Sequence, residues 1–151
     1  MKIHFSIAKN KKAKDVSAKL LNLYGQVELE KADIIVAVGG DGAMLAAMRE
    51  SINYDIPVFG LNRGNIGFLM NDFYESDLIK RLKNAYEIIV HPLEMVAVDS
   101  KNNQFTELAI NEVSIFRRTH QSAIISIKID NTERLNELTC DGVMLATPVG
   151  S

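Results

Sequence analysis

An apolar run that stops at a cluster of glycines constrains the fold of this chain more than any other feature of its sequence. The stretch 32–38 is predominantly apolar, which predicts a parallel strand covered on both of its faces. Residues 39–42, Gly-Gly-Asp-Gly, follow directly, and apolar residues then recur at helical spacing through residues 44–48. The sequence therefore places one carboxylate, Asp41, on a tight turn between a buried strand and a helix start, where phosphates and nucleotides are often bound.

Strands and helices alternate through the first 90 residues. Ile3, Phe5 and Ile7 alternate with polar residues as in a strand, and the helical pattern that follows is stopped by Gly25. In chain order, the expected elements are strands at 3–7, 32–38 and 57–61, and helices at 16–24, 44–48 and 78–86. This alternation predicts a Rossmann-like α/β fold, in which a parallel sheet is joined by right-handed crossovers.

The pattern changes near residue 91, after which the sequence predicts only strands. Ile125, Ile127 and Ile129 alternate with polar residues, and a turn-forming segment begins at Asp130. The expected strands lie at 94–99, 106–116, 125–129 and 143–146. We therefore predict an α/β nucleotide-binding domain over residues 1–90 and the first part of an all-β sandwich domain, left incomplete, over residues 91–151.

Composition limits the classes of partner. The chain has 151 residues, 47% of them hydrophobic, and a formal net charge of −2, so it predicts a globular core and no non-specific binding to nucleic acid or to an acidic membrane. Cys140 is the single cysteine, so an internal disulfide cannot form. The sequence has no apolar run of the roughly 20 residues that span a bilayer. A cytoplasmic protein is expected.

Two features of the first domain have both a structural and a functional interpretation. Lys9, Lys11, Lys12 and Lys14 make a basic loop after the first strand, which is either a solvated loop or one that attracts phosphate. Asp41 either caps the helix that follows it, by accepting a hydrogen bond from the first turn, or serves a ligand. The glycines on both sides of Asp41 favour the second interpretation, because they let a ligand approach the backbone closely.

Polar residues at three later places have similar alternatives. Apolar residues before and after Asn111–Glu112 have opposite parity, so the strand either carries a bulge there or ends and restarts. An amide beside a carboxylate can bind the hydrogen-bonding edge of a base or ribose hydroxyls. Asp141–Gly142 is either a turn or the place of a site carboxylate. Phe68, in the glycine-rich loop 62–68, is either a stacking platform or part of the core.

Taken together and in this order, the motifs resemble those of the NAD kinase family. The resemblance rests on the turn 39–42, the loop 62–69, the pair 111–112, Asp141–Gly142, and the Thr-Pro-Val-Gly-Ser segment 147–151. Lipid kinases and phosphofructokinases carry turns similar to the first motif, whereas the whole series is specific to the NAD kinases. The family's last motif continues beyond Ser151, so the chain looks like the amino-terminal portion of such an enzyme.

The resemblance implies transfer of the ATP γ-phosphoryl group to the 2′-hydroxyl of the adenosine ribose of NAD, which gives NADP. Asp41 is then the catalytic base for that hydroxyl, and Mg²⁺ or another divalent metal accompanies ATP, with no protein side chain assigned as its ligand. Members of the family are homodimers or homotetramers. The implied NAD-binding residues are Asp41, Gly42, Phe68, Asn111, Glu112, Thr139, Asp141 and Val149, and the implied phosphate-binding residues are Gly39, Gly40 and Gly42.

Three functions stay open on the sequence alone. The first is an NAD kinase with NAD and ATP as its partners. The second is a lipid kinase of the diacylglycerol type, which shares the glycine turn but has no use for the Asn111–Glu112 pair. The third is an inactive, truncated nucleotide-binding module. One departure from the family pattern is Ala43, where threonine or another polar residue is usual, so that a hydroxyl contact to a phosphate or to the helix end is missing.

Overall fold

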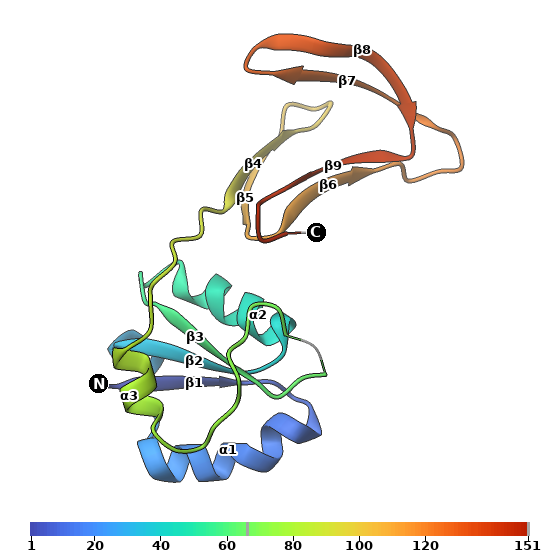
Figure 1. Cartoon of the computed structure of the whole chain (residues 1–151). Coiled ribbons are helices and arrows are strands. Elements are labelled where there is room, and N and C mark those ends of the chain that lie inside the picture. Colours follow the sequence, from blue (N-terminus) through green and yellow to red (C-terminus); the bar gives the residue numbers. More distant parts are fainter. Residues whose placement is uncertain (66, 151) are drawn as a thin grey trace. The chain divides into compact units, whose positions relative to one another are not determined.

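The computed structural model describes residues 1–65 and 67–150, which divide into two compact units (Figure 1). The first unit covers Met1–Ile88 and the second Ile89–Ser151, and each is described by itself. Within the described residues, no helix is both long and apolar enough to cross a membrane.

The first unit is a three-stranded parallel sheet with helices on both faces. Its strands lie in the order β1-β2-β3, and Val36 of β2 is in register with Phe5 of β1 and Phe59 of β3. The parallel α/β architecture expected from the sequence is thereby confirmed. In chain order the elements are β1 (Ile3–Ile7), α1 (Lys11–Tyr24), the 3-10 turn η1 (Leu29–Lys31), β2 (Ile34–Gly39), α2 (Asp41–Ser51), β3 (Val58–Asn62) and α3 (Leu78–Lys83).

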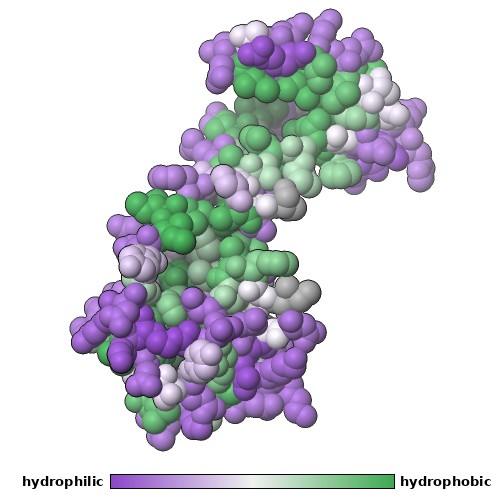
Figure 2. All heavy atoms as spheres, viewed as in Figure 1, coloured by the Kyte–Doolittle hydropathy of each residue, from purple (hydrophilic) through white to green (hydrophobic). Residues whose placement is uncertain are grey.

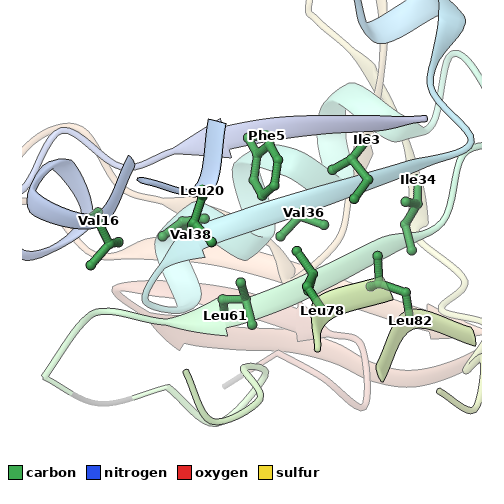
Figure 3. Close-up of a cluster of buried hydrophobic side chains, with 11 residues drawn as sticks. Ile3, Phe5, Val16, Leu20, Ile34, Val36, Val38, Leu61, Leu78 and Leu82 are labelled. Carbon is green, nitrogen blue, oxygen red and sulfur yellow. The ribbon is translucent and has the colours of Figure 1, made fainter. Parts of the chain in front are cut away.

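β2 is buried along its whole length because each of its faces is covered by helices. Val36 and Val38 pack in a cluster with side chains of α1 and α3, among them Leu20 and Leu78 (Figure 3). The intervening residues of β2 pack on the other face, against Ala47 of α2. Each such side chain contributes about 1.5–3 kcal/mol when it is fully buried. The double covering explains why the sequence of this strand is apolar without alternation.

The two connections between the strands have opposite hands. α1 joins β1 to β2 over one face of the sheet, and α2 joins β2 to β3 over the other face. The strands meanwhile follow one another in a single direction across the sheet. Two right-handed crossovers in that order would put both helices on the same face. The expectation of right-handed crossovers is therefore wrong for one of the two, and this departure is what covers both faces of so small a sheet.

α1 begins earlier than the sequence pattern suggests. The side chain of Asn10 accepts a hydrogen bond from the backbone N of Ala13 at 2.8 Å and so caps the helix. As a result Lys11, Lys12 and Lys14 lie on the first turn of α1, exposed to solvent, and only Lys9 stays in the connecting loop. The expected basic loop is thus mostly a basic helix start. At the other end the helix stops as predicted at Gly25, whose φ of 76° suits glycine.

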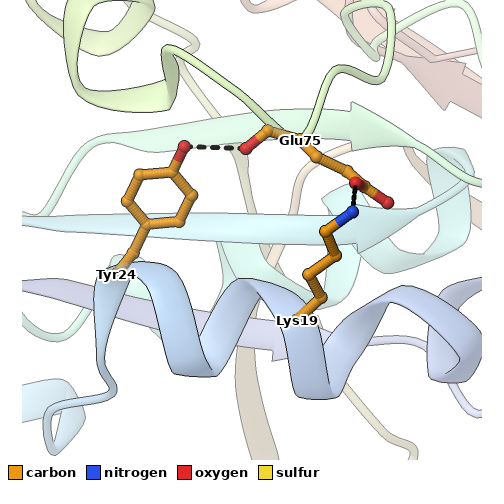
Figure 4. Close-up of polar contacts among 3 residues, drawn as sticks. All are labelled: Lys19, Tyr24 and Glu75. Carbon is orange, nitrogen blue, oxygen red and sulfur yellow. Dashed lines mark hydrogen bonds and ion pairs between the residues drawn. The ribbon is translucent and has the colours of Figure 1, made fainter.

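A segment that precedes α3 is fastened along α1 (Figure 4). The Tyr24 hydroxyl donates a hydrogen bond to the backbone O of Glu75 at 2.7 Å, and the Lys19 ammonium pairs with the Glu75 carboxylate. α3 itself ends at Lys83, so Tyr86 lies beyond the helix and is 96% exposed. The expectation of a helix as far as Tyr86 is therefore wrong, because the side chain of Tyr86 is exposed and buries no apolar surface that would extend α3.

The second unit consists of three two-stranded antiparallel sheets, β4-β5, β6-β9 and β7-β8. The single strand expected over 106–116 is two strands, β5 and β6, which have different partners, so the chain ends one strand and restarts another at Asn111. Between β7 and β8, Asp130 and Asn131 both have positive φ, as a tight hairpin turn requires. The strands are β4 (Leu93–Val98), β5 (Gln104–Ala109), β6 (Glu112–Phe116), β7 (Ala123–Ile129), β8 (Thr132–Cys140) and β9 (Gly142–Ala146).

Few side chains of the second unit are buried. Of its described residues, only Ile110 and Thr147 are buried, whereas large apolar side chains such as Phe105, Phe116 and Leu145 are more than half exposed. Figure 2 shows apolar residues open at the surface over these strands. The expectation of strands after residue 91 is met, and the sandwich arrangement stays a prediction.

Candidate active site

The carboxyl ends of the parallel strands bring the glycine turn and the loop after β3 together. Gly39, the last residue of β2, is in register with Asn62, the last residue of β3. A Cβ atom on Gly39 would lie 2.7 Å from the Cβ of Ala43 and 2.8 Å from that of Ala8. Glycine is therefore required at this position by close approach of neighbouring atoms. Gly40 precedes α2 without any side chain to cap the helix, so the first turn of α2 has no capping group of its own.

Asp41 is the first residue of α2 and reaches across to the loop that follows β3. Its Oδ2 accepts a hydrogen bond from the backbone N of Phe68 at 3.0 Å, and its Oδ1 accepts one from the backbone N of Leu69 at 2.9 Å. The side chain makes no capping bond to α2, so the interpretation of Asp41 as a helix cap is wrong. Asp41 is half-buried, and each carboxylate oxygen is held by one amide.

The chain that leaves β3 returns to the edge of this strand at Asn71. The backbone N of Asn62 donates to the O of Asn71 at 2.8 Å, and the N of Asn71 donates to the O of Gly60 at 3.0 Å. The backbone N of Arg63 donates to the O of Gly39 at 2.6 Å, which ties the loop to the glycine turn. The Phe68 side chain is 90% exposed, so it is not part of the core. The structure therefore brings the glycine turn 39–42 and Phe68 together in the first unit.

In the second unit, Asn111 and Glu112 place two acceptors side by side at the start of β6. Asn111 Oδ1 and Glu112 Oε2 are buried and have no hydrogen-bond partner among the described residues. A buried oxygen without a donor costs about 1–3 kcal/mol, so such atoms normally meet a donor that the chain itself does not supply. The pair is thus arranged to receive N–H or O–H groups.

The segment 147–150 folds directly onto Asn111. The backbone N of Thr147 donates to the O of Asn111 at 2.8 Å, and the Thr147 hydroxyl donates to the O of Ile110 at 2.6 Å. Gly150 lies so close that a Cβ there would be 2.3 Å from the Asn111 O. Val149, in the middle of this segment, is half-buried. Asn111, Glu112 and Val149 are therefore brought together, with Thr147 as the buried tie between them.

Thr147→Val should destabilise the second unit by about 1–3 kcal/mol, because it removes the buried donor to the Ile110 O without changing the shape of the side chain. Thr147→Ser keeps the hydroxyl and should cost less than half as much. Urea unfolding of both variants, followed by a probe in the second unit, measures the difference. A larger loss for serine than for valine would show that the methyl group, rather than the hydroxyl, stabilises this segment.

Asp141 lies apart from that pair, between β8 and β9. Its side chain is 70% exposed, and its Oδ1 accepts a hydrogen bond from Arg117 Nε at 2.5 Å. The backbone N of Arg117 donates to the O of Asp141 at 2.9 Å, and a Cβ on Gly142 would lie 2.2 Å from the Ile115 O. These contacts hold Asp141 at the bend between β8 and β9, with its carboxylate paired to Arg117 and open to solvent. Thr139 is exposed on β8.

Sequence reasoning did not find the amide donors that hold Asp41, nor the partner of Asp141. The donors at Phe68 and Leu69 are backbone groups, so no side-chain type announces them. Arg117 stands 24 positions before Asp141, and no sequence spacing links the two. As for metals, the described residues contain no group of three or more His, Cys, Asp or Glu side chains that could hold an ion.

Comparison with known proteins agrees with this arrangement of motifs. The family model of the ATP-NAD kinase N-terminal domain matches residues 2–89. Curated proteins named NAD kinase align with nearly the whole chain: that of Caulobacter vibrioides is 45% identical over 150 residues, covering 99% of this chain and 58% of the relative. That of Brucella suis biovar 1 is 48% identical over 149 residues, again covering 99% and 58%.

The relative from Rhizobium meliloti, also named NAD kinase, is 47% identical over 139 residues, which is 92% of this chain and 54% of the relative. The chain thus spans less than two thirds of the length of each of these relatives. The matched residues 2–89 hold the complete glycine turn and the loop that binds Asp41. The chain therefore belongs to the family defined by the ATP-NAD kinase N-terminal domain.

Proposed function

We propose that this chain supplies the catalytic carboxylate, the phosphate site and part of the NAD site of an NAD kinase. The enzyme transfers the γ-phosphoryl group of ATP to the 2′-hydroxyl of the adenosine ribose of NAD and releases NADP and ADP. One observation carries the proposal: Asp41 stands on an uncapped helix start, and two backbone amides fix its carboxylate. A helix start without a capping side chain has amide groups that suit a phosphate.

Asp41 acts as the general base in this reaction. Each of its oxygens accepts one amide hydrogen and keeps a further lone pair, so the carboxylate can still accept the ribose hydroxyl proton. As the bond between the 2′-oxygen and the γ-phosphorus forms, that proton passes to Asp41 and the bond to the ADP oxygen breaks. Phosphoryl transfer depends mainly on alignment and charge neutralisation, which a carboxylate held by two bonds provides on the acceptor side.

A divalent metal, Mg²⁺ above all, fits this site as a companion of the phosphates. Mg²⁺ commonly binds through one or two carboxylates together with substrate phosphates and water. Asp41 is the acidic side chain at the glycine turn, and the described residues hold no cluster that would bind an ion by itself. When bound, the metal neutralises the charge of the triphosphate oxygens.

The Asn111–Glu112 pair and its neighbours bind polar groups of NAD. Two buried acceptors without donors suit the exocyclic amine of adenine or the hydroxyls of a ribose. The exposed carboxylate of Asp141 suits the nicotinamide end, with Phe68, Thr139 and Val149 as further contacts. A lipid substrate would leave the two buried acceptors unsatisfied, which makes the lipid kinase the weaker alternative.

The second unit is best explained as part of a larger all-β sandwich. Its exposed apolar side chains and its near lack of buried residues leave it without a core of its own. Further strands, together with the partner subunits of a dimer or tetramer, would cover these surfaces and the strand edges. The homodimer or homotetramer expected from the sequence belongs to the same proposal.

Incubation of the full-length protein with ATP, NAD and Mg²⁺ should produce NADP, detected by a dehydrogenase that accepts only the phosphorylated cofactor. Omission of Mg²⁺ should abolish the product, because the triphosphate charge is then not neutralised. Binding of NAD without any turnover would favour the inactive nucleotide-binding module. Phosphorylation of diacylglycerol in place of NAD would favour the lipid kinase.

A further inference from the structure

The segment after β1 touches the glycine turn on one side, and the segment after β3 touches it on the other. A Cβ atom on Gly39 would lie 2.8 Å from the Cβ of Ala8. The backbone N of Arg63 donates to the Gly39 O at 2.6 Å. Charged residues in the segments after β1 and β3 therefore lie close to the turn that carries Asp41.

Both segments carry positive charge. Lys9, Lys11, Lys12 and Lys14 are exposed within six residues of one another, and Arg63 follows β3 directly. The whole chain has a net charge of −2, so this concentration of cations is local and is not a consequence of composition. A cationic patch of this kind attracts a polyanion and raises its local concentration.

One hydrogen bond joins the two segments: Lys12 Nζ donates to Asn65 Oδ1 at 2.8 Å. The contact brings an ammonium group from the first turn of α1 to the loop that Asp41 holds. The bond also keeps the Lys12 side chain extended toward that loop, which limits the entropy that it would lose on meeting a ligand.

The guanidinium of Arg63 lies on the same face of the sheet. It stacks over the Phe73 ring, 4.1 Å from the ring centroid, and Phe73 packs against the cluster that contains α1 side chains. Within the described residues the buried Arg63 Nε has no acceptor. The segment that carries Phe73 is also tied to α1 through Glu75 (Figure 4). This tie holds the Phe73 ring in place, and with it the guanidinium of Arg63.

We propose that Lys9, Lys12 and Arg63 form a cationic rim that binds the phosphate chain of the phosphoryl donor beside the glycine turn. The inference rests on the proposed function, and it gives a role to the basic segment 9–14, which takes no part in the proton transfer at Asp41. The turn 39–42 contains no lysine or arginine, so α2 offers only its partial positive charge. Asp41 adds a negative charge that repels a triphosphate, and the rim offsets that repulsion with full charges.

The ligand of the rim is a polyphosphate chain, whether it belongs to a nucleoside triphosphate or to an inorganic polyphosphate. The rim offers the positive charges of Lys9, Lys12 and Arg63, which bind phosphates. None of its described contacts would recognise the base of a nucleotide. Donor binding should therefore weaken with salt, because the lysines are exposed.

The test is the double variant Lys9→Gln/Lys12→Gln in the full-length protein. We expect the KM for ATP to rise about tenfold, equivalent to the loss of one or two charge contacts, while the KM for NAD stays within about twofold. Equilibrium dialysis with inorganic tripolyphosphate should show the same loss of affinity and a weaker dependence on salt. Arg63→Gln should also weaken binding of ATP and tripolyphosphate, whereas Lys12→Arg, which keeps the positive charge, should bind both as the wild-type protein does.

Two controls separate charge from structure. Asn65→Ala breaks the bond to Lys12 and keeps the ammonium, so donor affinity should fall less than in the double variant. Lys101→Gln removes a lysine from the turn between β4 and β5 and should change nothing. An unchanged KM for ATP and unchanged tripolyphosphate binding in the double variant would overturn the rim. A wild-type protein that binds tripolyphosphate but forms no NADP would instead overturn the proposed function and leave the rim standing.

Discussion

Asp41→Asn should lower the kcat of NADP formation by about 10²–10⁴-fold, the range that a positioned general base contributes. The amide has nearly the shape of the carboxylate but cannot accept the proton of the ribose hydroxyl at neutral pH. NAD affinity should fall by less than about tenfold, since the other NAD contacts remain. Steady-state kinetics for turnover and calorimetry for NAD binding give the two numbers separately.

The same substitution also tests how Asp41 holds its loop. An asparagine presents one acceptor and one NH₂ group, so it can keep only one of the bonds from Phe68 and Leu69. Hydrogen exchange at these two amides should therefore quicken in Asp41→Asn and quicken further in Asp41→Ala. If turnover fell in proportion to this loosening, and NAD affinity fell equally, Asp41 would be a positioning residue and the proton would have to go elsewhere.

The sequence predicts the first unit well where hydrophobic pattern decides the outcome. The apolar run in β2 implied burial on two faces, and the structure provides it through α1 and α2. The same pattern cannot tell on which face each helix lies, so the opposite hands of the two connections were not foreseen. Nor could it foresee that Asp41 would bond to amides 27 and 28 residues away, since every residue other than proline carries such a donor.

The second unit shows where pattern reasoning fails. β8 (Thr132–Cys140) was not predicted because its residues are almost all exposed and mostly polar, so that no alternation marks it. The change of parity at Asn111 marks a break in the strand, yet the sequence alone does not decide between a bulge and a restart. The choice depends on strand partners: β5 pairs with β4, which directly precedes it in the chain, whereas β6 pairs with the distant β9. Long-range pairing of this kind leaves little trace in local sequence.

Asp141 illustrates how a residue type can suggest a site without showing its surroundings. The pattern presented a carboxylate next to a glycine, and both a turn and a site were possible. The structure has a bend at Asp141 between β8 and β9, with Arg117 paired to the carboxylate and Gly142 close to the backbone of β6, and the role of Asp141 in a site stays a prediction. An exposed ion pair contributes at most about 1 kcal/mol, so Arg117 orients Asp141 more than it stabilises the unit.

Gly39→Ala and Gly42→Ala should change the stability of the first unit in opposite directions, although the two positions are only three residues apart. A Cβ at residue 39 would meet the Cβ atoms of Ala43 and Ala8 at 2.7 and 2.8 Å, and neither atom can rotate away. Relief requires a shift of backbone, which costs about 1–3 kcal/mol. A Cβ at residue 42 meets nothing within 4 Å, and its φ is not positive. Alanine there should raise stability by about 0.5–1 kcal/mol, because glycine is a poor helix residue.

Urea unfolding followed by circular dichroism at 222 nm measures this difference, since α1, α2 and α3 all belong to the first unit. The midpoint should fall for Gly39→Ala and rise for Gly42→Ala, with equal slopes in the two transitions. The pair is a matched comparison because the substitution is the same and both sites flank Asp41. A loss of stability at both positions would mean that the start of α2 tolerates no side chain, and the close packing at Gly39 would then not be what requires glycine in this turn.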